Sequence, residues 1–468
     1  MRNFVFNEAM KLRRQTLIKL AKLHLNNNLK SELAKLNKTL LPGPHPTYRT
    51  SIYHEREVLK QRIKLYLGLN YDKTRDFELF ELVDKIDNFL EEETYSSNDK
   101  FIQVIKEACD ACPSGKYYAT DLCRNCVAHS CKTVCPKGAI NIEHGRAKID
   151  SELCVGCGLC AKACNYFAIV KLERPCERAC HVNAIKNDQN NAAEIDRDRC
   201  INCAACYVAC PFGAIETPSA LLKVITHLKN NEKLKVIYAP SIVAQFGPKV
   251  QIGQIKKALL ETGFSSIYEA AVGADMVAKE EAEFIETAEN LVTTSCCPSF
   301  VDYIEKHQKD FINNISPALS PMSELAKEIK ESNEKIVFIG PCIAKKMEAY
   351  KTGKVDYVLT FEELATLFAA KGIEPSQLEN LEVEGSFDGW NFAQSGGVAN
   401  AVVNLCRKNL IVEKMDGISE GKELFKKAKT NKIDLIEGMA CEGGCICGPG
   451  IMVNPMVAKA GLKKINNL

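Results

Sequence analysis

Cysteine is the residue that most constrains what this chain can fold into. The sequence has 23 cysteines among 468 residues, sixteen between Cys109 and Cys210 and seven between Cys296 and Cys447. Paired arginines, Arg13 and Arg14, weakly match an export signal, but neither an apolar segment nor a cleavage site follows them. We therefore expect a cytoplasmic protein. In a reducing compartment, clustered cysteines indicate metal or metal-cluster binding rather than disulfides.

Two segments of the first group, "CVGCGLCAKAC" and "CINCAACYVACP", have the spacing C-x2-C-x2-C-x3-C. This spacing is typical of bacterial ferredoxins, in which three thiolates bind one 4Fe-4S cube and the fourth binds a neighbouring cube. Zinc sites favour paired C-x2-C knuckles with longer spacers. We therefore predict iron–sulfur clusters at Cys154, Cys157, Cys160 and Cys164, and at Cys200, Cys203, Cys206 and Cys210.

The other eight cysteines of this group are spaced less regularly, in "CDAC", "CRNCVAHSCKTVCP" and "CERAC". Applying the same sharing rule, we predict four cubes. Their ligand sets are Cys154, Cys157, Cys160 and Cys135; Cys123, Cys126, Cys131 and Cys164; Cys200, Cys203, Cys206 and Cys180; and Cys109, Cys112, Cys176 and Cys210. A zinc knuckle of Cys109, Cys112, Cys123 and Cys126 is an alternative. We thus expect two to four accessory clusters, which transfer electrons because four protein thiolates leave no open site for a substrate.

The chain divides into three regions by pattern. Residues 1–105 show helical periodicity and no visible chemistry, and residues 106–217 contain four similar segments, "CPKGAI", "CNYFAI", "CHVNAI" and "CPFGAI". In residues 218–468 short apolar runs alternate with helical stretches, which predicts a largely parallel sheet. The expected fold class is α/β, α+β overall. The formal net charge of +2 and the absence of a long apolar run favour neither nucleic acid nor a membrane as partner.

The second cysteine group lies where predicted strands end, in "TTSCCPSF" (293–300), "GPCIAKKMEA" (340–349) and "EGMACEGGCICGPG" (437–450). Parallel sheets bind ligands at the carboxyl ends of their strands. Four of these thiols, from Cys297, Cys342, Cys441 and Cys445, could therefore hold one further cube. Successive side chains of a strand point to opposite faces, so Cys296 is left as a spare thiol.

These three segments resemble the three motifs of the FeFe (iron-only) hydrogenases, TSCCP, PC-x-x-K-x-x-E and E-x-MAC-x-x-GC, in the same order. The resemblance covers about 230 residues from "KVIYAPS" onward, together with the ferredoxin-like region before them. It implies a two-lobed catalytic domain that carries an H-cluster. This is a 4Fe-4S cube joined through a cysteine to a two-iron site with carbon monoxide, cyanide and azadithiolate.

The resemblance also implies a function and partners. The chain would interconvert dihydrogen with protons and electrons, and its 4Fe-4S clusters would relay the electrons to a ferredoxin or a similar carrier. Dedicated maturation proteins would supply the two-iron unit.

Residue roles follow from the same resemblance. Cys297, Cys342 and Cys441 resemble ligands of the cube, and Cys445 resembles the cysteine that bridges the two units. The other counterparts are Cys296 as the thiol that passes protons to the azadithiolate amine, Lys345 as donor to one cyanide, Ala239, Pro240 and Ser241 as the segment lining the other, and Met439 as the methionine beside the two irons.

The sequence departs from the family in three places. Gly340 replaces the usual methionine before "PC", and Cys447 is added two residues after Cys445. The outer proton relay has Glu281 or Glu283 and Ser316 as candidates, but Phe284 stands where a further glutamate is expected. Glu348 matches the family's glutamate, although it could merely orient Lys346 or the backbone. Cys406 is expected to pack in a helix, and Cys447 either to pack or to modulate the bridge.

Two alternatives to the enzyme stay open. One is a catalytically silent hydrogenase-like sensor or iron–sulfur assembly protein that keeps the cube without the two-iron site. Cys296, Lys345 and Met439 are useful only around that site, so their presence favours the enzyme. The other is a subunit that passes electrons to a partner bound by the basic N-terminal helices.

Overall fold

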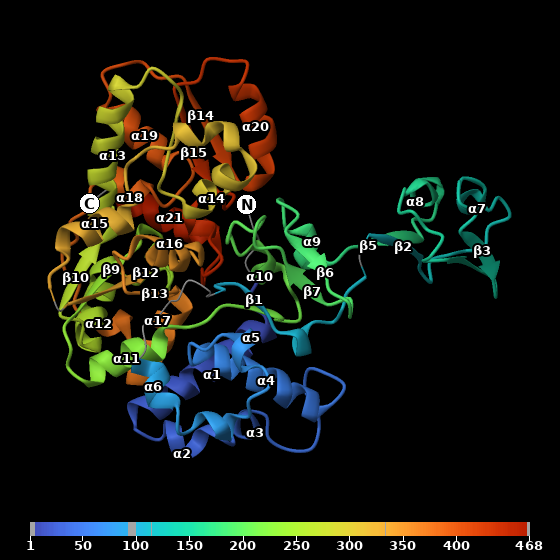
Figure 1. The fold of residues 1–468 in the computed structure, drawn as a ribbon, viewed down its shortest axis with the longest axis horizontal. Helices are drawn as coiled ribbons and strands as arrows, with labels where there is room; N and C mark the ends of the chain where they lie inside the picture. Colours follow the sequence, from blue (N-terminus) through green and yellow to red (C-terminus); the bar gives the residue numbers. More distant parts are fainter. Residues whose placement is uncertain (1–4, 92–99, 114, 333, 466–468) are drawn as a thin grey trace.

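The computed structural model describes residues 5–91, 100–113, 115–332 and 334–465. It has a layer of N-terminal helices, an iron–sulfur region of small hairpins that extends to one side, and a larger C-terminal body built on two parallel sheets (Figure 1). The predicted α/β class and parallel sheets are confirmed.

The first sheet has the strand order β10-β9-β12-β13, with every pair parallel. Its strands are β9 (Leu234–Tyr238), β10 (Ser266–Glu269), β12 (Lys335–Ile339) and β13 (Tyr357–Leu359). Strand β9 is buried along its whole length, as expected for a parallel strand covered on both faces. Helices that pack on this sheet are α12 (Ile252–Thr262), α13 (Ala270–Thr287), α16 (Ala344–Thr352) and α17 (Phe361–Lys371).

The second sheet has the order β11-β15-β14, also parallel. Its strands are β11 (Val292–Thr293), β14 (Val412–Asp416) and β15 (Leu435–Met439). The helices around it are α14 (Pro298–His307), α19 (Gly397–Leu405) and α20 (Gly421–Ala428), while α15 (Pro321–Ile329) and α18 (Phe387–Asn391) pack on α13. Helix α21 (Pro455–Ile465) follows the last cysteine motif. The two sheets form two lobes, and their carboxyl ends carry the three cysteine motifs.

The N-terminal helices cover the underside of the body (Figure 1). They are α1 (Glu8–Leu25), α2 (Leu29–Leu33), α3 (Leu36–Leu40), α4 (Ile52–Tyr66), α5 (Tyr71–Thr74) and α6 (Ile86–Glu91). Helix α1 packs on α17 and on α11 (Leu221–Lys229). Among the described residues, no helix combines the length and the apolar character needed to cross a membrane.

The iron–sulfur region consists of antiparallel strand pairs joined by cysteine loops. The pairs are β1 (Gln103–Val104) with β8 (Ile215–Glu216), β2 (Lys116–Ala119) with β5 (Ile169–Leu172), β3 (Ile140–Glu143) with β4 (Arg146–Ile149), and β6 (Ile185–Asn187) with β7 (Ala193–Ile195). The short helices α7 (Ser130–Thr133), α8 (Leu159–Ala163), α9 (Pro175–Arg178) and α10 (Ala205–Ala209) carry cysteines. Residues 116–172 form a lobe that projects from the body, whereas α9 and α10 lie close to it (Figure 1).

Candidate active site and iron–sulfur centres

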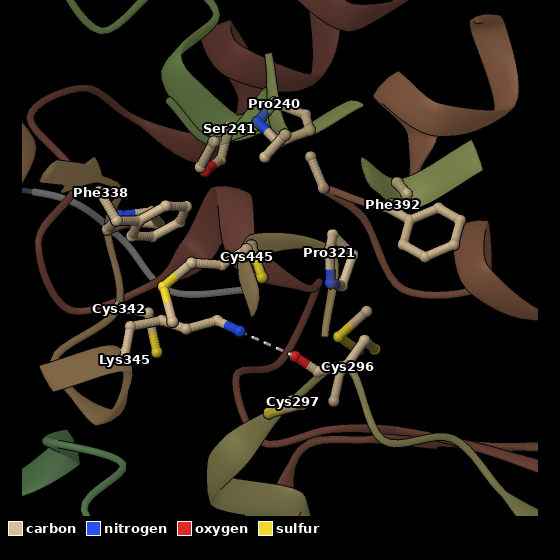
Figure 2. A pocket seen from close by; sticks show the side chains of 17 residues that line it. Pro240, Ser241, Cys296, Cys297, Pro321, Phe338, Cys342, Lys345, Phe392 and Cys445 are labelled. Carbon is tan, nitrogen blue, oxygen red and sulfur yellow. Dashed lines mark hydrogen bonds between the residues drawn. The ribbon is translucent and has the colours of Figure 1, made fainter. Parts of the chain in front are cut away.

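Four cysteines of the second group line one cavity between the two lobes. Cys297 caps the start of α14, Cys342 follows β12, and Cys445 begins a short 3-10 turn. All three line the cavity together with Cys296 and Lys345 (Figure 2). Burial raises the pKa of Cys441, and the neighbouring Cys342, Cys297 and Cys445 raise it further. The four thiols predicted to hold a cube therefore lie within electrostatic reach of one another.

Cys296 faces the same cavity as its neighbour Cys297 and not the solvent. The expectation that the two side chains point to opposite faces of a strand is wrong, because β11 ends at Thr293, before the pair. Burial raises the pKa of its thiol well above the ordinary value, with Glu281 as the next cause. Met439, the last residue of β15, also lines the cavity. The spare thiol and the methionine thus border the space next to Cys445, where the resemblance puts the two-iron unit.

Lys345 extends from the start of α16 into the cavity (Figure 2). Its Nζ atom donates to Glu348 Oε2 at 2.6 Å, to Ser320 Oγ at 2.7 Å and to the Cys296 carbonyl at 3.3 Å. Burial disfavours its charge, but the Glu348 carboxylate outweighs this and raises the pKa of Lys345. The ammonium group is therefore held charged at the cavity wall.

Glu348 orients Lys345 and not Lys346, which corrects one of the roles expected for it. Its carboxylate pairs with Lys345, whereas Lys346 points away and donates to the Pro218 carbonyl at 2.6 Å. Glu348 thus positions the lysine of the motif, because one turn of helix brings a residue and its third neighbour to the same face.

The donor set of the cavity fits an anionic polyatomic group. Ser241 is completely buried, lines the cavity, and its Oγ atom has no hydrogen-bond partner among the residues that the structure describes. A buried hydroxyl without a partner is costly, so a ligand that accepts its hydrogen bond would be stabilised. Ala239 and Pro240 lie beside it, and Lys345 supplies a charged donor across the cavity (Figure 2). Two donors on facing walls suit two buried anionic ligands.

The space left by Gly340 is filled by a residue of β12, the strand that ends just before it. A Cβ atom at position 340 would lie 2.7 Å from Cε1 of Phe338, and the Phe338 ring lines the cavity. The loss of the larger side chain is therefore compensated by a phenylalanine two residues earlier in the chain.

Two candidates for the proton relay, Glu281 on α13 and Ser316, lie close together. The Glu281 carboxylate is fully buried and accepts from the Ser295 backbone N–H at 3.3 Å, and Ser316 is near enough to lower its pKa in part. Burial raises the pKa of Glu281 to about 7. Its Oε2 atom has no partner within the described part of the chain. A carboxyl group with a pKa near neutrality is suited to accept and release protons.

Glu283, the other candidate, is exposed on the opposite side of α13. Two residues along a helix turn a side chain through about 200°, so Glu281 and Glu283 cannot both face the core. The structure therefore corrects the prediction that left both open. Phe284 is 38% exposed and offers no proton-carrying group.

The sixteen cysteines of the iron–sulfur region are brought together in the predicted sets. Cys135, Cys154, Cys157 and Cys160 line one cavity, and Cys109, Cys112, Cys176 and Cys210 line another. The other two sets are recognised by the thiols that raise one another's pKa. Burial raises the pKa of Cys131, and its neighbours Cys164, Cys123 and Cys126 add to this. Burial raises the pKa of Cys206, and its neighbours Cys203, Cys200 and Cys180 add to this. This geometry disfavours the zinc knuckle, because Cys109 and Cys112 lie with one set and Cys123 and Cys126 with another.

The cysteine loops share one backbone conformation. The second residue after the first cysteine has a left-handed φ in each of the four loops, at Ala111, Asn125, Gly156 and Asn202. Backbone N–H groups point at sulfur: Ala139 to Cys135, Ala184 to Cys180 and Ala214 to Cys210, at 3.2–3.4 Å. Such hydrogen bonds tune cluster potentials. They also explain the shared endings "CPKGAI", "CHVNAI" and "CPFGAI", in which an alanine follows four residues after cysteine.

The sets form a series that leads to the catalytic cavity. Burial and the thiols of its own set raise the pKa of Cys206, and Cys176 of the next set adds to this. Burial and the thiols of its own set likewise raise the pKa of Cys203, and Cys297 of the C-terminal body adds to this. The set around Cys203 is thus next to the cube site of the body, and the set around Cys176 follows it outward.

Several residues that complete the candidate site were not predicted from the sequence. Ser320 and Ser295 hold Lys345 and Glu281, and Phe338 fills the wall beside Gly340. Glu437 of β15 is buried, and its carboxylate lies at the start of α19. It accepts hydrogen bonds from the backbone N–H groups of Gly396 and Ala399. The "E" of "EGMAC" was a usable signal for Glu437, whereas the serines carry none.

Two parts of the chain match known protein families. Residues 232–449 match the family described as iron only hydrogenase large subunit, C-terminal domain. Residues 147–170 and residues 192–215 match families of 4Fe-4S binding domains.

Three relatives show how far the similarity extends. Iron hydrogenase 1 of Clostridium pasteurianum is 30% identical over 322 residues, which cover 54% of this chain and 56% of that protein, just over half its length. The periplasmic Fe hydrogenase large subunit of Nitratidesulfovibrio vulgaris is 28% identical over 384 residues, covering 67% of this chain and 88% of that protein. The cytosolic Fe-S cluster assembly factor NAR1 of Encephalitozoon cuniculi is 26% identical over 189 residues, 35% of this chain and 52% of that protein.

Proposed function

Because the chain belongs to the iron-only hydrogenases through residues 232–449, with ferredoxin-type 4Fe-4S motifs before them, we propose that it interconverts dihydrogen with protons and electrons. The observation that carries this proposal is a cavity lined by Cys297, Cys342 and Cys445 together with Cys296 and Lys345, with Cys441 close to the first three thiols. Four thiols alone account for a cube. The spare thiol and the buried ammonium have a use only if a second, anionic unit binds beside it.

Each wall of the cavity has a task in this proposal. Cys297, Cys342 and Cys441 would hold the cube, and Cys445 would hold both the cube and a two-iron unit with carbon monoxide, cyanide and azadithiolate. When bound, that unit would supply the iron Lewis acid and the base for heterolytic splitting of dihydrogen. Lys345, fixed by Glu348 and Ser320, would face one cyanide, and Ser241 with Ala239 and Pro240 would line the other.

Protons leave through the chain's own groups. Cys296 accepts a proton at Sγ and passes it to the unpartnered Glu281 Oε2, and Ser316 takes it from there. Met439 and the apolar walls exclude bulk water from the site. Electrons leave through the sets of Cys203 and Cys176 toward the projecting lobe, where we propose that a ferredoxin or similar carrier docks.

We also propose the division of the chain into an N-terminal helical region (1–105), a ferredoxin-like region with four 4Fe-4S clusters (106–217) and an H-cluster domain (218–468). Maturation proteins that install the two-iron unit belong to this proposal as partners.

The test is an anaerobic assay of purified protein loaded with a synthetic two-iron complex. Under dihydrogen, it should reduce a viologen dye, and Cys296→Ala should slow this roughly 10²–10⁴-fold with its clusters intact, since one general acid–base group is removed. Protein that keeps all its clusters and the two-iron unit, yet never reduces the dye, would contradict the proposal.

The second candidate is an iron–sulfur assembly or sensor protein without turnover. The similarity to the assembly factor over 35% of the chain is the observation that favours it. In that case the protein would keep its 4Fe-4S clusters but would not reduce the viologen dye under dihydrogen, with or without the synthetic two-iron complex.

A further inference from the structure

One turn beyond Glu281, the same face of α13 carries Phe284 and no acid. Glu281 is buried in the core, while Glu283 is exposed on the other side of the helix. Glu286, two residues beyond Phe284, accepts from the Arg407 backbone N–H at 2.7 Å. A phenyl ring can neither accept nor donate a proton, so the route from Ser316 to solvent must lie elsewhere.

A cavity lined by both apolar and polar side chains opens on the other side of Ser316. It has a volume of about 240 Å³ and lies between α14, the segment 315–323 and α16. Ser295 and Ser316 line its inner end, and Glu305 and Lys351 line its outer end. The volume has room for several water molecules, and hydroxyl and carboxylate groups supply the partners that buried water needs. We call it the Ser316 cavity.

The outer end of the Ser316 cavity reaches the molecular surface. The side chains of Glu305 and Lys351 are 44% and 48% exposed, and their charged atoms lie 3.5 Å apart. Lys351 also binds Asp302 Oδ1 at 2.8 Å. A carboxylate at a solvent-exposed mouth can exchange protons with bulk water.

The wall of the Ser316 cavity is coupled to the catalytic cavity at a second point. Glu348 Oε1 accepts from Ser323 Oγ at 2.7 Å and from Ser320, while its other oxygen holds Lys345. Ser320, Ser323 and Glu348 all line the Ser316 cavity. The two groups of polar residues near Cys296, one around Ser316 and one around Glu348, therefore both line the Ser316 cavity.

We propose that protons pass from Ser316 into the Ser316 cavity and reach solvent at Glu305, between α14 and α16, instead of along α13. Each transfer moves one proton and no electron: the O–H bond of one group breaks as that of the next forms. A catalytic use of this exit rests on the proposed function, whereas the exit itself can be measured without turnover.

The experiment follows hydrogen–deuterium exchange of the Cys296 thiol by infrared spectroscopy. Protein with its iron–sulfur clusters and the synthetic two-iron complex is held under argon and mixed with deuterated buffer. The S–H band of Cys296 is identified by its loss in Cys296→Ala. Val301 lines the cavity from α14, so Val301→Phe fills the cavity, and Val301→Ala, the matched control, leaves it open.

The expected result is exchange at least about tenfold slower in Val301→Phe and unchanged in Val301→Ala and Phe284→Ala. Thr352→Leu fills the cavity from the opposite wall and should act like Val301→Phe, with Thr352→Ser as its control, so a fold defect at one position does not decide the outcome. Wild-type exchange in both filled variants, or slow exchange only after substitutions at Phe284, would overturn the exit. Slow exchange in filled variants of a protein that never turns over dihydrogen would leave the exit standing and remove the proposed function.

Discussion

At the scale of single residues, Glu281 is the group on which the inner relay depends. We predict that Glu281→Gln slows dihydrogen oxidation roughly 10²–10⁴-fold, because an amide keeps the size of the side chain but cannot relay a proton. Since burial raises its pKa to about 7, the carboxyl is protonated below that pH and ionised above it. Infrared titration should show a protonated carboxyl band that disappears as pH rises through about 7.

The matched control is Glu283→Gln, on the exposed side of the same helix. It should leave both turnover and the titrating band unchanged. A band that persists in Glu281→Gln would assign the titration to another group and contradict the relay.

Lys345 and Glu348 act as one unit at the cavity wall. Lys345→Met removes the charged donor, and we predict that the variant fails to retain the synthetic two-iron complex while its 4Fe-4S content stays normal. Glu348→Gln keeps a hydrogen-bond acceptor but no charge, so the complex should bind with a shifted cyanide band. Iron analysis and infrared spectroscopy measure both. Full retention by Lys345→Met would remove the lysine from the binding site.

At the scale of elements, α1 fastens the three parts of the chain together. Arg13 is buried and binds Glu216 of β8, in the iron–sulfur region, at 3.3 Å and Glu362 of α17 at 3.5 Å. Arg62 of α4 binds the same Glu216 at 3.2 Å. The helical region therefore holds the cluster loops against the body, which gives residues 1–105 a structural task.

We predict that Arg13→Ala lowers stability by about 1.5–3 kcal/mol, because Glu216 and Glu362 each lose one of two charged partners and keep only Arg62 and Arg14. Lys11→Ala, whose ion pair with Glu8 is at the surface, should change stability by less than about 0.5 kcal/mol. Apparent unfolding temperatures at one fixed scan rate compare the two. Equal unfolding temperatures for both variants would show that α1 does not fasten the body.

Elements were predicted well where sequence periodicity and fold rules coincide. The runs "KVIYAPS", "KIVFIGP" and "DYVLT" became parallel strands, and the strand-end cysteines met at one cavity because parallel strands share a carboxyl edge. The partners that finish the site come from other segments: Ser320 from the start of α15 and Phe338 from inside β12. Such long-range contacts have no local spacing, so no sequence pattern indicates them.

At the scale of the whole molecule, the cluster sets extend from the catalytic cavity to the projecting lobe of residues 116–172 (Figure 1). We predict that Cys126→Ala, in the set with Cys131 and Cys164, removes one cube, about four irons, and slows electron exchange with a protein carrier such as ferredoxin. Exchange with a small viologen should change less, since the dye can also reach inner clusters. Cys406→Ala, a packing thiol that contacts the Ala282 carbonyl, is the control. Equal loss with both acceptors would contradict entry through this lobe.

We propose that the cavity between the lobes holds a cube and a two-iron unit that react with dihydrogen. An infrared difference spectrum of the loaded chain, argon against dihydrogen, tests this in the window between the amide and thiol bands. We expect bands of iron-bound carbon monoxide and cyanide that shift when dihydrogen replaces argon. Bands that are identical under both gases, with every 4Fe-4S cluster in place, would contradict it.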